Sequence, residues 1–327
     1  MEPLSLGQQF SANQKIISPQ NAIASLFAIL NMFLNFFVLA IIHERVPPYD
    51  ELPDLSFDIL PKAAWGLDVA EYIISIQAFL VLILLFLHRF RIVLFRRLCV
   101  IMGVIYLLRA ICMASTQVPL IHPIKFNYCA KKMDPDQRAS WSYYLPEIFR
   151  RVFHMMWGFG LSINGQHVYC GDYIFSGHTV TLTFFYLFLR EYMVPKQTKR
   201  SIYWGIFNTI LLGSSVGGVI LILVARGHYL IDVIIAYFVT TTTFFVYHTI
   251  IYHRALRQSN QKNHLSMFWW WPLMKYLECD HIFCSSLCPK CETITLEVPR
   301  AFSWPFSWPR FSEETRSTSL ERLLNQA

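Results

Sequence analysis

Two short polar motifs interrupt hydrophobic surroundings in this chain of 327 residues. The first, CGDYIFSGHT, covers residues 170–179, and the second, HYLID, covers residues 228–232. They bring three ionisable side chains, His178, His228 and Asp232, into stretches that are otherwise typical of membrane spans. Placing such groups in a bilayer costs several kcal/mol each on most scales, so three of them together indicate chemistry rather than packing.

The residue types and their spacing suit the transfer of a phosphoryl group. His228 and Asp232 are four residues apart, so on a helix they share a face and the carboxylate can orient the imidazole. A neutral imidazole is a competent nucleophile toward phosphorus, and a covalent intermediate divides the transfer into two easier steps. His178 follows the small pair Ser176 and Gly177 and can protonate the leaving oxygen. We therefore expect His178, His228 and Asp232 to be catalytic.

Groups that can hold a phosphate lie beside these residues. Backbone N–H groups at a helix start near Ser176 and Gly177, together with the fixed charge of Arg226, can bind an anion. We expect neither a metal nor another cofactor to be required. A single histidine in an aromatic membrane helix is more often a packing residue, and His248 and His253 are interpreted in that way.

The composition indicates a membrane protein rather than a soluble enzyme, since 54% of the residues are hydrophobic and 16% are aromatic. Six apolar stretches approach the roughly 20 residues needed to cross a bilayer, so we expect an all-α protein with six transmembrane helices. The first stretch is too long and too late for a cleaved signal peptide. The stretches cover residues 23–42, 70–87, 98–115, 173–189, 202–224 and 229–252.

The distribution of Lys and Arg predicts the orientation of the spans. Basic side chains gather in the turns 89–97 and 190–200, and such turns remain on the cytosolic side. Both chain ends should then be cytosolic, with His178 and His228 at the opposite face. We expect a cytosolic N-terminal tail, a six-span catalytic membrane domain and a Cys-containing cytosolic tail, covering residues 1–22, 23–252 and 253–327. The net charge of +7 suits anionic cytosolic lipid and carries no nucleic-acid signal.

The motifs resemble those of the sphingomyelin synthase family, a branch of the lipid phosphate phosphatase superfamily. The third block of that family, C-G-D-x3-S-G-H-T, is complete in Cys170, Gly171, Asp172, Ser176, Gly177, His178 and Thr179. The fourth block matches in His228, Tyr229, Asp232, Val233, Tyr237, Phe244, Tyr247 and His248, with Leu230 in place of the usual Thr. The second, R-R-x8-Y-x2-R-x6-T, is complete in Arg96, Arg97, Tyr106, Arg109 and Thr116. The first, P-P-L-P-D, survives only in Leu52, Pro53 and Asp54, which leaves the role of that loop open.

The resemblance implies a lipid phosphate phosphatase-like bundle whose His178, His228 and Asp232 face the lumen or the cell exterior. It implies transfer of phosphocholine from phosphatidylcholine to ceramide with release of diacylglycerol, His228 being the nucleophile and His178 the acid. The partners would be these lipids and the bilayer of the Golgi, the plasma membrane or both. Other hypotheses are a ceramide phosphoethanolamine synthase, a lipid phosphatase or phospholipase C-type hydrolase, and an inactive lipid-binding scaffold.

Several further residues are candidates for binding substrate. Arg109, in the middle of the third stretch, can pair with an acidic residue or face a lipid-phosphate cavity. Asp172 can cap the following helix, the simpler interpretation, or position His178. Tyr106, Tyr229 and Tyr237 can attract a quaternary ammonium group through their ring faces, although ordinary packing explains any one of them.

The long loop before the fourth stretch contains Cys129 and Cys170, both expected on an oxidising side. The sequence leaves open whether they form a disulfide. Residues 152–163 are apolar and aromatic but too short to span, so we expect an interfacial or re-entrant segment that roofs the lipid entrance. His154 within it has no partner that the sequence identifies.

The C-terminal tail is polar and contains cysteines. Acylation of these cysteines or free thiols are the favoured interpretations, and zinc is the alternative, because only one C-x2-C pair is present. The repeat SWPFSWP further on suggests a flexible end. Whether copies of the chain form a homo-oligomer is open. The cysteines are Cys279, Cys284, Cys288 and Cys291, with His281 among them.

Overall fold

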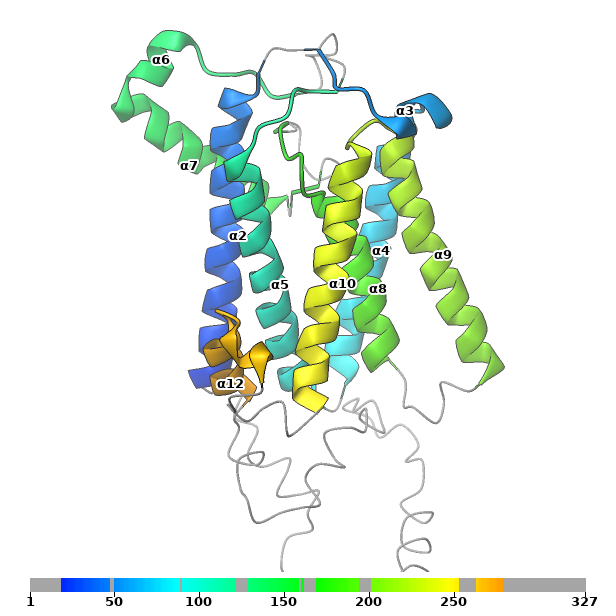
Figure 1. The fold of residues 1–327 in the computed structure, drawn as a ribbon. Coiled ribbons are helices and arrows are strands. Elements are labelled where there is room, and N and C mark those ends of the chain that lie inside the picture. Colours follow the sequence, from blue (N-terminus) through cyan, green and yellow to red (C-terminus); the bar gives the residue numbers. More distant parts are fainter. Residues whose placement is uncertain are drawn as a thin grey trace, which may run out of the picture.

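The computed structural model describes residues 19–47, 50–88, 90–121, 129–158, 160–161, 169–193, 201–252 and 263–278. The regular structure of these residues is built from helices, as the sequence predicts (Figure 1). In chain order they are α2 (Pro19–Arg45), α3 (Leu55–Ile59), α4 (Trp65–Leu87), α5 (Arg91–Ser115), α6 (Pro135–Ala139), α7 (Trp141–Trp157), α8 (Gly177–Tyr192), α9 (Ile202–Val224), α10 (Leu230–Tyr252), the 3-10 helix η4 (His264–Met267) and α12 (Trp271–Glu278).

In the part of the chain that the structure describes, α2, α4, α5, α9 and α10 are long and apolar enough to cross a membrane. The chain is therefore a multi-pass membrane protein. The bounds of α9 are those of the predicted stretch 202–224. The predicted stretch 173–189 corresponds to α8, which begins at Gly177 and has 16 residues. Among the described residues, five helices rather than the six expected are therefore long enough to cross a bilayer.

Helix α8 lies in the interior of the bundle, where it contacts α4, α9 and α10. Its side chains Leu182, Phe184 and Phe188 have no exposed surface, so a helix of modest length is buried along most of its circumference. The most extensive contact between two helices joins α2 and α5. Outward-facing apolar side chains such as Phe79 and Phe86 on α4 remain exposed, as lipid-facing residues should be.

Helices α3, α6 and α7 lie at one end of the bundle, near the start of α10, and α12 lies at the other end (Figure 1). A buried ion pair holds α7 against α2: Arg151 Nη1 lies 2.6 Å from Glu44 Oε1. The same carboxylate accepts a hydrogen bond from the backbone N–H of Met133. The segment after Cys129 is thereby fixed to the first long helix.

The opposite end is closed by a buried polar network that includes part of the expected tail. Arg97 donates two hydrogen bonds to Glu278 of α12 and one to Tyr192 of α8. The Tyr192 hydroxyl lies 2.6 Å from His248 Nε2, so His248 is a hydrogen-bonded packing residue, as expected. Trp270, Trp271, Met274, Leu277 and Glu278 are buried, so the packed part of the chain continues to α12. His253 and the tail cysteines are outside the described residues.

Candidate active site

The two histidines of the polar motifs meet where α8 and α10 begin. Ser176 is the N-cap of α8, and its hydroxyl accepts a hydrogen bond from the Thr179 N–H. His178 stands in the first turn of α8, and His228 lies two residues before α10. Their ring centroids are 5.7 Å apart with an interplanar angle of 62°. The structure therefore brings these two side chains together, and their catalytic role stays a prediction.

Asp232, in the first turn of α10, lies beside the His228 ring. Its Oδ2 lies 3.4 Å from Nδ1 of His228, and the exposed fractions of these residues are 0% and 2%. The carboxylate also accepts hydrogen bonds from the backbone N–H groups of Tyr229 and Ile174. Ile174 has a φ of 71°, which is costly for a β-branched residue. Asp232 therefore stabilises the strained turn before α8 and lies on the Nδ1 side of the His228 ring.

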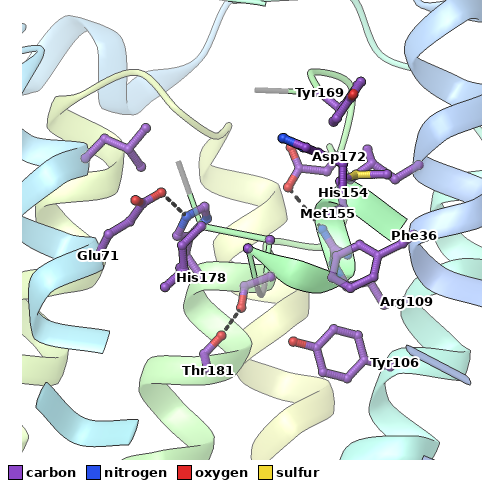
Figure 2. A pocket seen from close by; sticks show the side chains of 16 residues that line it. Phe36, Glu71, Tyr106, Arg109, His154, Met155, Tyr169, Asp172, His178 and Thr181 are labelled. Atoms are coloured by element: carbon purple, nitrogen blue, oxygen red, sulfur yellow. Dashed lines mark hydrogen bonds and ion pairs between the residues drawn. The ribbon is translucent and has the colours of Figure 1, made fainter. Parts of the chain in front are cut away.

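Glu71 of α4 is the partner of the other histidine, and the sequence interpretation had missed it. Nε2 of His178 lies 3.2 Å from Oε1 of Glu71, which is 1% exposed (Figure 2). Because a carboxylate only accepts hydrogen bonds, Nε2 must carry a proton. Among the described residues, Nδ1 of His178 has no hydrogen-bond partner. The general rule that an ionisable residue inside a span needs a function would have singled out Glu71.

A pocket opens in front of His178 (Figure 2). Its wall combines apolar side chains with the charged groups Glu71, Arg109 and Asp172, a combination suited to a lipid with a polar head. His228 and Asp232 are not in the wall, but the His228 ring lies 5.7 Å from the ring of His178. The lining residues are Phe36, Leu39, Leu67, Glu71, Tyr106, Arg109, His154, Met155, Gly158, Gly160, Leu161, Tyr169, Asp172, Gly177, His178 and Thr181.

Arg109 is both an internal ion-pair partner and part of the pocket wall. Its Nη2 lies 3.0 Å from Oδ2 of Asp172, Nε donates to the Phe175 carbonyl, and Nη1 donates to Asn35 Oδ1. Gly177 makes this position possible, because a Cβ there would lie 3.2 Å from the guanidinium carbon. Burial acts to raise the pKa of Asp172, but the charges of His228, Arg109 and His178 outweigh it and hold that pKa below its ordinary value.

Replacing Arg109 with lysine should destabilise the fold, although the positive charge is kept. An ammonium group cannot reach Asp172, Asn35 and the Phe175 carbonyl together, so buried partners are left unpaired. We expect the free energy of unfolding to fall by about 3 kcal/mol. Thermal unfolding of the purified protein measures this effect, with Arg190→Lys on the exposed end of α8 as the control. Equal melting temperatures for both variants would contradict it.

The structure places other predicted site residues away from the pocket. Arg226 donates to the Phe57 carbonyl and stacks 4.3 Å over the Phe57 ring. Tyr229 is buried, with its hydroxyl donating to Pro119. Tyr237 is 59% exposed on α10, because five residues after Asp232 a helix has turned to another face. The three tyrosines therefore do not share one binding face, and ordinary packing, the simpler interpretation, holds for Tyr229. Of the three, Tyr106 lines the pocket.

The capping prediction for Asp172 is also wrong, because Ser176 caps α8 and Asp172 pairs with Arg109 instead. A serine directly before the helix satisfies an N-terminal N–H more easily than a residue four positions further away. Ser176 itself has no exposed surface and is absent from the pocket wall, so its contribution is to the start of α8.

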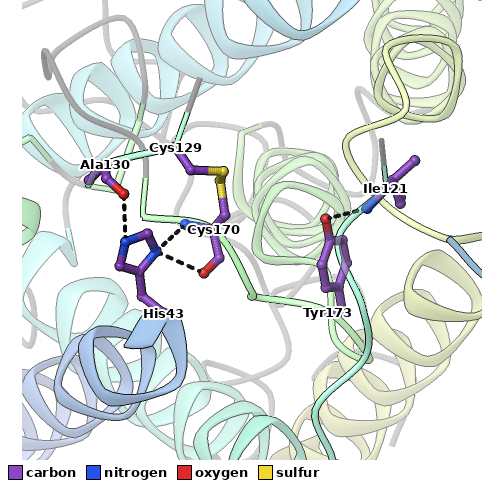
Figure 3. The surroundings of a disulfide bond; sticks show 6 residues. All are labelled: His43, Ile121, Cys129, Ala130, Cys170 and Tyr173. Atoms are coloured by element: carbon purple, nitrogen blue, oxygen red, sulfur yellow. Dashed lines mark hydrogen bonds between the residues drawn. A yellow bond between two sulfur atoms is a disulfide. The ribbon is translucent and has the colours of Figure 1, made fainter. Parts of the chain in front are cut away.

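Cys129 and Cys170 form a disulfide next to this site, with a Cα–Cα distance of 5.7 Å (Figure 3). His43 of α2 contacts the backbone on both sides of the bond, through the Ala130 carbonyl and both the N–H and carbonyl of Cys170. The bond therefore fastens the long loop two residues before Asp172. No cluster of three His, Cys, Asp or Glu side chains with metal-site geometry occurs within the described ranges.

Comparisons with known proteins cover the part of the chain that contains this site. The family described as PAP2 superfamily C-terminal matches residues 169–249, which contain both polar motifs. Phosphatidylcholine:ceramide cholinephosphotransferase 2 of Homo sapiens is 36% identical over 293 residues, covering 89% of this chain and 72% of the relative. Phosphatidylcholine:ceramide cholinephosphotransferase 1 of Homo sapiens is 34% identical over 306 residues, covering 93% of this chain and 67% of the relative. Sphingomyelin synthase-related protein 1 of Mus musculus is 37% identical over 200 residues, covering 60% of this chain and 38% of the relative.

Proposed function

This chain belongs to the sphingomyelin synthase family, and on that premise we propose that it transfers phosphocholine from phosphatidylcholine to ceramide, releasing diacylglycerol. The observation that carries the proposal is the pair of histidine rings 5.7 Å apart, one of which, His178, lines a pocket with both apolar and charged side chains. One ring is paired with Asp232 and the other with Glu71. Two neighbouring imidazoles, each with its own carboxylate, can act as the nucleophile and the general acid of a group transfer.

In the first step, Nε2 of His228 attacks the phosphorus of the donor lipid. A P–N bond forms and the bond from phosphorus to the diacylglycerol oxygen breaks, while His178 protonates that oxygen. Since Nε2 of His178 donates its hydrogen bond to Glu71, Nδ1 is the nitrogen left to give the proton, and the ring must be doubly protonated before this step. Asp232 stabilises the charge that develops on His228. The positively polarised N-terminus of α8 and the guanidinium of Arg109, which packs against Gly177, stabilise a bound phosphate anion.

In the second step, the primary hydroxyl of ceramide attacks the phosphorus of the phosphorylated His228. His178 removes the hydroxyl proton, the P–N bond breaks, and the phosphocholine ester of ceramide is released. Water would compete as an acceptor for the same intermediate. The apolar part of the pocket wall, including Phe36, Leu39 and Met155, favours a lipid acceptor by limiting access of water.

We also propose that α8 is a sixth span and that both chain ends are cytosolic. Helix α8 is about 24 Å long at 1.5 Å per residue, which is short for a bilayer. Its position inside the bundle supports spanning, because α4, α9 and α10 pack against it. The basic segment of α5 that starts at Arg91 lies at the end opposite the site, which supports a non-cytosolic active site in the Golgi or plasma membrane.

Helix α7 supports delivery of lipid from the non-cytosolic leaflet. Exposed apolar side chains follow one another every four residues along it, forming a lipid-facing stripe, while Met155 faces α2 and the pocket. Such a helix lies in the membrane interface. We propose that it borders the opening through which the acyl chains enter. The stripe consists of Trp141, Leu145, Phe149, Phe153 and Trp157.

A charge on this stripe should impair the use of bilayer lipids selectively. We expect Phe153→Glu to raise KM for long-chain phosphatidylcholine in vesicles about tenfold, because the carboxylate resists insertion. KM for a short-chain donor dispersed in water should stay within about twofold, since that donor bypasses the leaflet. Tyr143→Glu, exposed on the same helix but off the stripe, is the matched control. Equal changes for both donors would refute the role of α7 in delivery.

The proposed donor and acceptor can be tested with purified protein in liposomes. Fluorescent ceramide is supplied with phosphatidylcholine or phosphatidylethanolamine as the separate donor, and the products are resolved by thin-layer chromatography. We expect labelled sphingomyelin from phosphatidylcholine. Product from phosphatidylethanolamine alone would identify a ceramide phosphoethanolamine synthase instead. Diacylglycerol release without any ceramide product would identify a hydrolase.

A further inference from the structure

The loop before α4 contacts the segment that contains His228, although the two are about 170 residues apart in sequence. Asp54, at the start of α3, accepts a hydrogen bond of 2.8 Å through Oδ2 from the backbone N–H of Leu230. Its Oδ1 accepts from the N–H and the hydroxyl of Ser56 and so caps α3. One carboxylate therefore caps its own short helix and the first residue of α10.

A second contact holds the same segment on the other side of His228. Arg226 has a φ of 58°, in the left-handed region that non-glycine residues seldom adopt. Its guanidinium donates a hydrogen bond of 2.7 Å to the Phe57 carbonyl and stacks over the Phe57 ring. Arg226 lies two residues before His228 and Leu230 two residues after it. Both anchoring partners, Asp54 and Phe57, belong to the α3 segment.

Further contacts make the attachment continuous. The Tyr229 hydroxyl accepts a hydrogen bond from the Leu52 N–H, and the Tyr229 ring lies 5.6 Å from the Phe57 ring. The Ala63 N–H donates to the Val224 carbonyl at the end of α9. Burial acts to raise the pKa of Asp54, but hydrogen bonds from Ser56 and Leu230 and the charge of Arg226 lower it overall. The carboxylate is therefore ionised at neutral pH, when charged acceptors bind N–H groups most strongly.

We infer that Asp54 is a positioning residue for the proposed phosphocholine transfer, fixing the backbone on both sides of His228 in concert with Phe57 and Arg226. Asp54 does not line the pocket, so it acts through the backbone of the His228 segment rather than on the lipid. Asp232 sets the ring of His228 from within α10, whereas Asp54 sets the direction in which α10 begins. This gives a role to Asp54 of the partly preserved first sequence block. The inference rests on the proposed function only where it is tested by activity.

The variant Asp54→Ser separates this role from the capping of α3. Serine is as good an N-cap as aspartate, so α3 should persist, but its short side chain with one oxygen cannot also reach Leu230. We expect kcat to fall roughly 10- to 100-fold with KM within about twofold, because misplacing a nucleophile slows chemistry without removing lipid contacts. Asp58→Asn is the matched control, since Asp58 is exposed on the same helix.

Hydrogen–deuterium exchange provides a readout that does not depend on activity. In Asp54→Ser we expect faster exchange confined to residues 226–233, with the rest of α10 and the α3 segment unchanged. Wild-type kcat together with wild-type exchange in this segment would overturn the inference. Faster exchange throughout the bundle would equally overturn it, because Asp54 would then be a general stability residue. If the wild-type protein makes no sphingomyelin, the proposed function fails while the exchange measurement still tests the contact.

Discussion

Replacing His228 with alanine should reduce the initial rate of sphingomyelin formation by about a thousandfold or more. Among the described residues, this imidazole is the group with a nitrogen that can both attack phosphorus and be stabilised by Asp232, at 3.4 Å. Without it, no P–N bond forms, and ceramide would have to displace diacylglycerol directly in a geometry that the site does not support. Fluorescent ceramide in phosphatidylcholine liposomes measures the rate.

The control is His264→Ala, because His264 is exposed in η4 at the opposite end of the protein. It should leave the rate within about twofold of the wild type, as exposed substitutions away from special contacts usually do. Equal melting temperatures of the wild type and the His228→Ala variant would show that the fold is intact. A folded His228→Ala variant that retained a tenth of the wild-type rate would rule out His228 as the nucleophile.

Replacing Asp232 with asparagine should lower kcat by about a hundredfold to a thousandfold while lipid binding is retained. An amide that keeps the hydrogen bond from Ile174 presents its NH2 group to His228 Nδ1 and leaves the Tyr229 N–H without its acceptor. That nitrogen must then accept a hydrogen bond, so the proton moves to Nε2 and occupies the atom that should attack phosphorus. The variant therefore selects the unreactive tautomer. The loss of charge near the phosphorylated imidazole adds to the effect.

Asp136→Asn is the matched control for this substitution, since Asp136 is an exposed carboxylate on α6 at the same end of the bundle. Steady-state kinetics separate kcat from KM, and quenching of intrinsic fluorescence by a lipid analogue measures binding independently. Activity equal to that of the control would remove Asp232 from the mechanism. Loss of binding in parallel with loss of turnover would instead indicate that Asp232 only maintains the fold.

The parts of the site that the sequence predicts are those in which local chemistry conflicts with the surroundings. Ionisable groups in apolar stretches identify His178, His228 and Asp232, because nothing but function or pairing explains their cost. The helices are predicted well where hydrophobicity alone determines their extent, and α9 has the expected bounds. The start of α8 moves from the predicted Tyr173 to Gly177, because the caps and strained turn before it are set by tertiary contacts.

Contacts between distant segments explain most of what sequence reasoning missed. The charge of Arg226 predicts a phosphate ligand. In the structure its guanidinium instead donates a hydrogen bond to the Phe57 carbonyl. The pairing of Arg109 with Asp172 was one of two open alternatives, and only the structure identifies the partner. The disulfide between Cys129 and Cys170 likewise depends on a distance that no spacing fixes. Glu71 is a different case: it is an ionisable residue inside a span, so the argument that identified the histidines also identifies it from the sequence.

The stereochemical course at phosphorus tests the proposed two-step transfer through His228 most directly. Phosphatidylcholine with one non-bridging oxygen replaced by sulfur is chiral at phosphorus, and its configuration can be compared with that of the sphingomyelin product. Each in-line displacement inverts the centre, so formation and breakdown of a phosphohistidine predict overall retention. Inversion in the product would mean that ceramide attacks the donor lipid directly, and would contradict a covalent intermediate on His228.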